Sequence, residues 1–144
     1  MLLTVSLWSR PIPRRGCGER PGYNPTPNGY SHLALFPPGW RIILPAGQGG
    51  ETEDEELSDD FATQFKQALA NVETVLKATN AKMSDVAKIT LLIVDHDKEK
   101  FRVMTEEVER VWGNNQPAST LIPVPALALE GMPVEIDVIA VVPA

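Results

Sequence analysis

Two segments of the chain carry apolar residues at helical spacing and are predicted to form amphipathic helices. The first follows Ser58, which can cap a helix N-terminus, and ends near Asn80, which tolerates the left-handed conformation of a helix end. The second spans about Lys98–Trp112 and is followed by Gly113. The apolar face of the first helix comprises Phe61, Phe65, Ala68, Leu69, Val72, Val75 and Leu76.

Short runs of apolar and β-branched residues predict strands around these helices. Val86–Val94 is predicted to be a central strand. Ser119–Val124 and Val134–Val142 are two further strands, joined by a connection marked by proline and glycine. Upstream, Ser31–Phe36 and Trp40–Pro45 flank a Pro-Pro-Gly sequence, and this spacing predicts a β-hairpin.

The predicted elements follow the order β-β-α-β-α-β-β. This order favours an α+β sandwich in which two helices cover one face of a mixed β-sheet. The predicted domain spans residues 23–144. Residues 1–22 contain four arginines and three prolines, and prolines interrupt helices and strands, so we expect a flexible or locally ordered extension. This extension lacks the basic region that precedes the apolar stretch of a secretory signal.

Composition narrows the possible functions of the chain. Its 144 residues suit one domain with a sizeable core, and no apolar run approaches the length of a membrane helix. The net charge of -6 argues against a nucleic-acid-binding surface, which is normally basic. A single cysteine, Cys17, excludes an internal disulfide and fits the reducing cytoplasm.

Few residues stand out as candidates for chemistry. Glu135 is a carboxylate in a strongly apolar strand, so it is either solvated at a sheet edge or part of a polar site. His96 lies between two aspartates but has no other histidine at metal-ligand spacing. The acidic residues 51–56 lack the spacing of a calcium loop. No metal or other cofactor is predicted.

Several short motifs occur in an order and spacing that resemble those of a known family. Pro117-Ala118 is followed downstream by Val134-Glu135-Ile136 and Val138-Ile139-Ala140. Upstream lie Tyr30-Ser31, Gly47-Gln48 and a helical face with Gln64, Ala68, Leu69 and Asn71. Together these motifs resemble the Rid superfamily, also called the YjgF or endoribonuclease L-PSP family, from about Tyr23 to Pro143.

The resemblance implies a fold, an assembly and a chemistry. It implies a chorismate-mutase-like fold and a homotrimer with small-molecule sites in the clefts between subunits. Active members of the family hydrolyse enamines and imines derived from amino acids, which gives 2-oxo acids and ammonia. By this resemblance Glu135 is the catalytic candidate that orients or activates water. The ligand-binding candidates are Tyr30, Gln48, Ser119 and Thr120.

One residue of the family pattern is replaced in this chain. The family has an arginine after the Pro-Ala pair, where it grips the substrate carboxylate, but this chain has Ser119. Arg41 and Arg102 could in principle supply a guanidinium, although both are expected to face solvent. A neutral hydroxyl is a weaker carboxylate ligand than a guanidinium, so imino-acid deaminase activity is expected to be weak or altered.

Three hypotheses about function follow. The first is a trimer that binds a small metabolite in clefts between subunits, with weak or altered deaminase activity. The second is an enamine or imine deaminase that acts on a different substrate and releases ammonia. The third is an endoribonuclease or translation inhibitor, which the acidic charge of the chain disfavours. The sequence favours the first hypothesis, with no nucleic acid or membrane as partner.

Overall fold

A computed structural model describes residues 25–144, so the predicted extension, residues 1–22, lies outside the described part of the chain. The elements follow the order strand, strand, helix, strand, helix, strand, strand, as predicted. They are β1 (Arg41–Ile43), β2 (Gln48–Gly49), α1 (Phe61–Lys77), β3 (Val86–Val94), α2 (Lys98–Trp112), β4 (Ala118–Val124) and β5 (Val134–Val142), with short 3₁₀ turns η1 (Thr26–Asn28) and η2 (Met83–Asp85).

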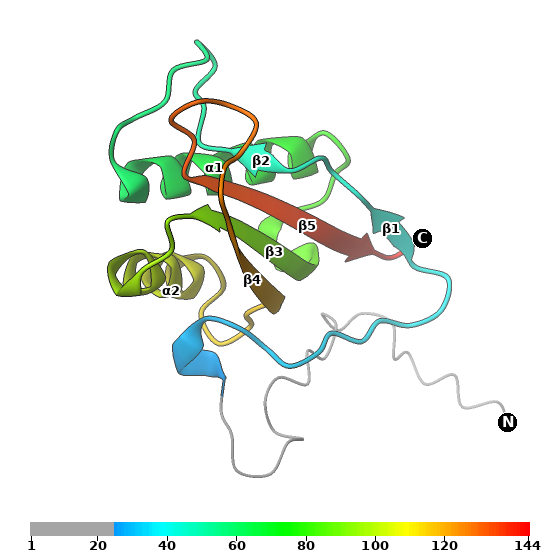
Figure 1. The fold of residues 1–144 in the computed structure, drawn as a ribbon. Helices are drawn as coiled ribbons and strands as arrows, with labels where there is room; N and C mark the ends of the chain where they lie inside the picture. The colour runs from blue at the N-terminus through cyan, green and yellow to red at the C-terminus, as the bar shows by residue number, and fades with distance from the viewer. Residues whose placement is uncertain (1–24) are drawn as a thin grey trace, which may run out of the picture.

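The strands form one mixed sheet in the order β1-β5-β3-β4, and β2 also pairs with β5 (Figure 1). β5 runs antiparallel to β1, β2 and β3, whereas β3 and β4 are parallel. β1 and β2 therefore share one edge of β5, while β4 forms the opposite edge of the sheet and contains Pro123. The prediction of a mixed sheet is confirmed.

Both helices lie on one face of this sheet, as predicted (Figure 1). One hydrophobic core joins the inner faces of α1 and α2 to alternate residues of β3 and β5. Alternation arises because successive side chains of a strand point to opposite faces. The largest fully buried side chains of the sheet layer are Ile89, Leu91, Ile93 and Ile136, followed by Val86 and Val134.

The prediction of a β-hairpin formed by Ser31–Phe36 and Trp40–Pro45 is wrong, because each segment pairs with another strand. Within the second segment only Arg41–Ile43 forms a strand, and it pairs with the C-terminal residues of β5. The first segment contributes one isolated bridge, from Ser31 to Ala118. Prolines between the two segments lack the N–H groups that a ladder needs, whereas the edge of β5 offers a long regular partner.

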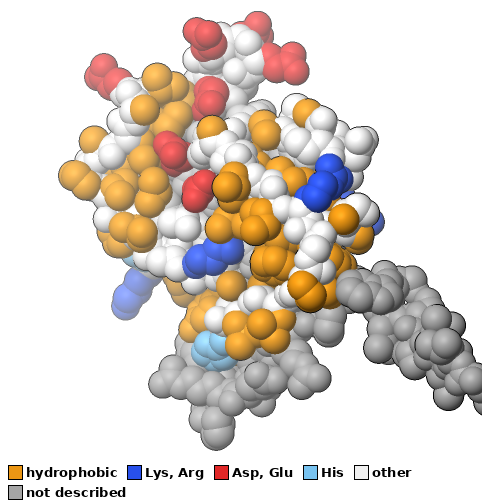
Figure 2. Space-filling view, turned by 90° about the vertical axis from the view of Figure 1, so that its right-hand side faces the viewer, with side chains coloured by type: hydrophobic (Ala, Val, Ile, Leu, Met, Phe, Trp, Pro, Cys, Tyr) orange, Lys and Arg blue, Asp and Glu red, His pale blue; other side chains and the backbone are white. Residues whose placement is uncertain are grey.

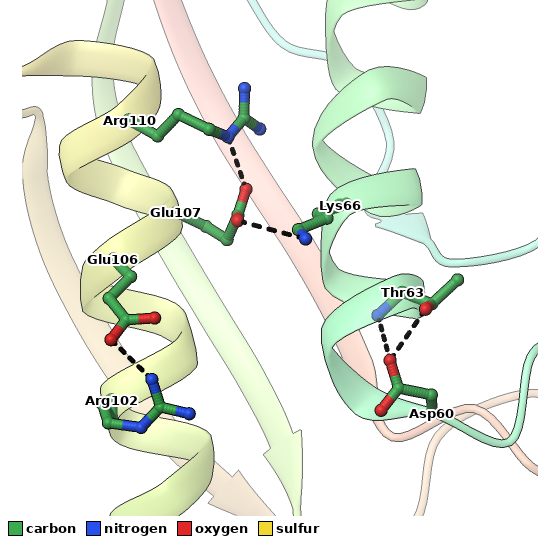
Figure 3. Close-up of polar contacts among 7 residues, drawn as sticks. All are labelled: Asp60, Thr63, Lys66, Arg102, Glu106, Glu107 and Arg110. Atoms are coloured by element: carbon green, nitrogen blue, oxygen red, sulfur yellow. Dashed lines mark hydrogen bonds and ion pairs between the residues drawn. The ribbon is translucent and has the colours of Figure 1, made fainter.

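Ser58 was predicted to be the N-cap of the first helix, but α1 begins two residues later than this prediction implies. Asp60 is the N-cap, and its carboxylate accepts hydrogen bonds from the backbone N–H of Thr63 at 2.8 Å and from the Thr63 hydroxyl at 2.7 Å (Figure 3). The Ser58 hydroxyl instead accepts from the N–H of Asp60 at 3.1 Å. At the other end, Asn80 has a φ of 58°, which confirms the left-handed conformation predicted there.

The sheet face opposite the helices is left open by the described residues and carries exposed apolar side chains. Ile139 on β5 is 36% exposed, Ile122 on β4 42%, and Ile42 on β1 55%. Figure 2, which views the molecule from the right-hand side of Figure 1, shows hydrophobic side chains in several groups with acidic side chains among them. Exposed apolar groups in such number are typical of an interaction surface.

The cap at Asp60 gives a first prediction. Asp60→Ala should lower the melting temperature, because the Thr63 N–H loses its acceptor, whereas Asp60→Asn should preserve most of the stability. Asp59→Ala, one residue earlier and exposed, is the matched control. Thermal unfolding followed by circular dichroism measures all three. A destabilisation by Asp59→Ala as large as that by Asp60→Ala would contradict the assignment of the cap.

The contribution of this cap to stability should decrease as the pH falls. The hydroxyl and the N–H of Thr63 hold the pKa of Asp60 below its usual value of 3.8. A carboxylate with a lowered pKa stabilises the fold at pH values above that usual value, and this contribution is lost as the pH falls through the lowered pKa. The difference in melting temperature between wild type and Asp60→Ala should therefore be full at neutral pH and shrink in strong acid.

Candidate functional site

Ser119 and Tyr30 line a small cavity on the helix side of the sheet. Ser119 shares the face of Leu121, which packs against the core, because the two residues are two positions apart on β4. The cavity has a volume of about 270 Å³ and is lined by Asn28, Tyr30, Phe101, Met104, Ser119 and Leu121. Two of the ligand-binding candidates therefore lie together.

A buried serine positions the segment that carries Tyr30. The N–H of Ser31 donates to the carbonyl of Pro117 at 3.0 Å, and its hydroxyl donates to the carbonyl of Gln116 at 2.7 Å. Ser31 is only 6% exposed. These two bonds fix the segment before β1 against the start of β4, so Tyr30 is held beside Ser119.

Glu135 lies on the other face of the sheet. It pairs with Gly49 across the β2–β5 ladder, and its carboxylate lies against Gly47. A Cβ at Gly47 would lie 2.1 Å from the Glu135 Oε1 atom, so a glycine is needed there for this position of the carboxylate. Among residues 25–144 no side chain or backbone group donates a hydrogen bond to this carboxylate, which is half-buried. Glu135 is thus available to a ligand or to water.

Helix α1 fixes the strand that lies beside Glu135. The amide of Asn71 donates to the carbonyl oxygens of Gly49 at 2.9 Å and of Glu51 at 2.8 Å. The amide of Gln48 donates to the carbonyl of Ala46 at 2.9 Å. Both residues therefore hold the local backbone. Gln48 pairs with the buried Ile136 rather than with Glu135, so its side chain is directed away from the face that carries the carboxylate.

Thr120 points to the open face with Glu135, although it follows Ser119 directly. Its hydroxyl accepts a hydrogen bond from Lys88 on the adjacent strand β3. Burial lowers the pKa of Lys88. Sequence reasoning missed this cation, although a single lysine within the apolar run Val86–Val94 is a visible signal.

The predicted site residues do not converge within one protomer. Tyr30 and Ser119 lie on the helix side of the sheet, whereas Glu135 and Thr120 lie on the open side. Adjacent residues of a strand point in opposite directions, so Ser119 and Thr120 cannot face the same ligand from one copy of β4. The candidates are thus divided between the two faces of the sheet, and each group is here called a half-site. On the open face β3 separates Thr120 from Glu135.

Neither of the two alternative arginines joins a half-site. Arg102 lies on the outer surface of α2, where it binds Glu99 and, at 2.5 Å, Glu106 (Figure 3). These carboxylates raise its pKa further above the usual range. Arg41 is exposed in β1, opposite Val142 at the far end of β5 from Glu135. The expectation that Arg102 and Arg41 face solvent is confirmed.

Two further features of the described part of the chain concern metal binding and membrane insertion. No group of three or more His, Cys, Asp or Glu side chains there could hold a metal ion. His96 instead packs its ring against Phe101, with 6.2 Å between the ring centroids. Among the helices within residues 25–144, none is long and apolar enough to cross a membrane.

Comparison with known proteins identifies relatives over most of the chain. Residues 24–142 match the family model described as endoribonuclease L-PSP. A human 2-iminobutanoate/2-iminopropanoate deaminase is 31% identical over 103 residues, which cover 70% of this chain and 73% of the relative. YyfB from Yersinia pestis, a member of the conserved Rid protein family, superposes with a TM-score of 0.81 at 27% identity over 89% of this chain and 98% of its own.

A second solved structure gives the same result. RidA from the Antarctic bacterium Psychrobacter sp. superposes with a TM-score of 0.65 at 26% identity over 78% of this chain and 88% of its own. The match to the family model, over residues 24–142, spans both half-sites and all seven helices and strands from β1 to β5. The predicted resemblance and the α+β fold that it implies are therefore confirmed.

The contacts of Asn71 generate a prediction about the segment that contains β2, beside Glu135. Asn71→Asp replaces the amide donor by a carboxylate facing two carbonyl oxygens, which should cost about 1–3 kcal/mol of unfolding free energy. Urea denaturation measures the loss, and amide hydrogen exchange should accelerate at residues 48–51. Asn114→Asp makes the same chemical change at an exposed turn and should be nearly neutral. Equal stability of the two variants would show that Asn71 does not hold this segment.

Proposed function

This chain belongs to the endoribonuclease L-PSP family, which includes the Rid proteins, and from this we propose that it acts as a homotrimer binding a small metabolite between subunits. We further propose that its imine-hydrolysing activity is weak or altered, because Ser119 stands where the family pattern has an arginine. The proposed compartment is the cytoplasm.

The division of the candidates into two half-sites is the observation that carries this proposal. Ser119 and Glu135 point to opposite faces of one sheet, so a small ligand cannot touch both side chains of a single copy. A ligand that needs both must lie where the Ser119 side of one copy approaches the Glu135 side of another. The cleft between subunits that the family resemblance implies provides such a place.

The open face of the sheet supports assembly through the same surface. It carries the exposed side chains of Ile42, Ile122 and Ile139 on three different strands. Burial of apolar surface contributes about 25 cal/mol per Å² removed from water, which favours covering this face with another copy. Glu135 lies on this face and would then be enclosed near the edge of the interface.

The chemistry of the cleft depends on Glu135 and on what replaces the arginine. Hydrolysis of an imine adds water to the carbon of the C=N bond, forms a carbonyl group and releases ammonia. The Glu135 carboxylate, which has no donor among residues 25–144, can accept a proton from that water. The Ser119 hydroxyl offers one neutral donor to a substrate carboxylate, worth about 1 kcal/mol against roughly 1.5–3 kcal/mol for a charge-assisted bond.

A deaminase for a different substrate is the second candidate function. It is favoured by the similarity to a human 2-iminobutanoate/2-iminopropanoate deaminase and by the presence of Glu135 at the motif position. A substrate without a carboxylate at the Ser119 end would need no guanidinium. An endoribonuclease activity, suggested by the family's description, is disfavoured because a chain with a net charge of -6 would repel RNA phosphates.

The proposed assembly is tested by mass in solution. Light scattering after size-exclusion chromatography should give a mass near three times the 15.8 kDa of one chain. Ile139→Lys places a charge on the open face and should dissociate the assembly, whereas Thr74→Lys on the exposed side of α1 should not. A monomeric wild type would refute the proposal of shared sites.

The proposed chemistry is tested with 2-iminopropionate generated in situ by an amino-acid oxidase. Wild type should hydrolyse it slowly, and Ser119→Arg should increase kcat/KM by on the order of 10²-fold by restoring a bidentate carboxylate contact. Glu135→Gln should abolish the gain, because the amide cannot accept the proton. A fast wild type, unaffected by either substitution, would overturn the roles of both residues.

A further inference from the structure

A groove between the two helices forms a second cavity, on the outer side of the helix layer. Its volume is about 390 Å³, within the range of small-molecule sites in proteins. α1 contributes a stripe of residues three or four positions apart, and α2 and η2 close the other side. The lining consists of Lys66, Leu69, Ala70, Glu73, Met83, Arg110 and Val111, none of which belongs to either half-site.

A buried carboxylate holds two cations at this groove. Glu107 is 8% exposed, and it accepts a hydrogen bond from Arg110 Nε at 2.7 Å. Lys66 Nζ lies 3.7 Å from its other oxygen (Figure 3). A buried carboxylate needs such partners, since its desolvation is otherwise too costly. Glu107 therefore fixes a lysine of α1 and an arginine of α2 side by side.

The two cations retain unused donors. Arg110 binds Glu107 through Nε, and neither of its Nη atoms has a partner among residues 25–144. Figure 3 shows the end of the guanidinium group pointing away from Glu107. Two Nη groups in one plane match the two oxygens of a carboxylate.

The charge balance of the cluster favours a monoanion. Lys66 and Arg110 carry two positive charges and Glu107 neutralises one, which leaves one positive charge at the groove. Glu73, at the other end of the α1 stripe, forms its own ion pair with Lys77 at 3.2 Å. A single carboxylate would neutralise the cluster, whereas a doubly charged phosphate would leave an excess of negative charge.

The floor of the groove is apolar and fixed. Leu69 is 3% exposed, and Met83 and Val111 are half-buried at the edge of the core. The backbone of Met83 is held because the indole N–H of Trp112 donates to its carbonyl oxygen at 2.7 Å. An apolar body that lies on this floor removes hydrophobic surface from water on both sides.

From this geometry we propose that the groove between α1 and α2 binds a small carboxylic acid with an apolar body. The carboxylate binds Arg110 through its two Nη groups, with Lys66 as a second cation. The body lies on Leu69, Met83 and Val111. This site is separate from the cleft proposed above, and neither its existence nor its test depends on the activity of that cleft.

The probe for this proposal is 3-phenylpropionate, titrated into the isotope-labelled full chain and followed by NMR of assigned backbone amides. We expect saturable shifts confined to residues of α1, η2 and α2 that surround the groove. The uncharged analogue 3-phenylpropanamide should bind at least about 10-fold more weakly, because it lacks the charge that Arg110 and Lys66 recognise. Equal binding of acid and amide would overturn the proposal.

Three variants test whether binding of 3-phenylpropionate depends on the groove or only on surface charge. Arg110→Ala should raise the dissociation constant of 3-phenylpropionate at least about 10-fold by removing the free donors. Ala70→Trp fills the groove from an exposed position while both cations stay in the chain, and should have the same effect. Arg102→Ala removes an arginine of similar exposure on the same helix, away from the groove, and should leave binding within about 2-fold of wild type.

The titration tests the groove independently of the proposed function of the cleft between subunits. Shifts centred on Tyr30, Ser119 or Glu135 would place the acid in the half-sites and refute a separate groove site. An absence of saturable shifts up to millimolar probe, or an equal loss of binding in Arg102→Ala, would refute it as well. Amide spectra of each variant without probe establish that the fold is retained. Ala70→Trp keeps Glu107, Lys66 and Arg110 in the chain and tests the groove if Arg110→Ala does not fold.

Discussion

The pairing of β5 with three other strands is the interaction on which the rest of the structure depends. β3 lies along one side of it, and β1 and β2 lie along the other. This pairing places Gly47 beside Glu135 and gives α1 a strand to hold through Asn71. It also sets which residues face the helices, because a strand alternates strictly between its two faces. A shift of register by one residue would exchange the core face of β5 with its open face.

The same alternation explains why one chain carries two incomplete half-sites. Ser119 and Glu135 belong to strands that are fixed in one sheet. The alternation of side chains along these strands places the two residues on opposite faces of the sheet. No rotamer of either side chain crosses the sheet, so only a second copy can bring such groups to one ligand. The groove between α1 and α2 differs in this respect, because both of its cations and its whole floor come from a single chain.

Much of the fold could be predicted from local patterns. β3, α2 and β5 have the bounds that the sequence indicated, because each is a long periodic segment with a clear end. The prediction of a hairpin before α1 was wrong, since β1 pairs with β5, about one hundred residues away along the chain. Glu135 stood out as a charge in an apolar strand, but its contact with Gly47 depends on that distant pairing. Lys88 gave the same kind of signal, yet only the register with β4 shows that it binds Thr120.

The two edges of the sheet have a consequence for association of the folded chain. Beyond β5, one edge consists of β1 and β2, which have only three and two residues and are separated by an unpaired stretch. The other edge is β4, where Pro123 has no N–H to donate and Ser31 already bridges to Ala118. Short, interrupted or proline-containing edges offer a poor template to an incoming strand. Uncontrolled growth of the sheet by strand addition is thereby blocked, while its apolar face stays free for a defined contact.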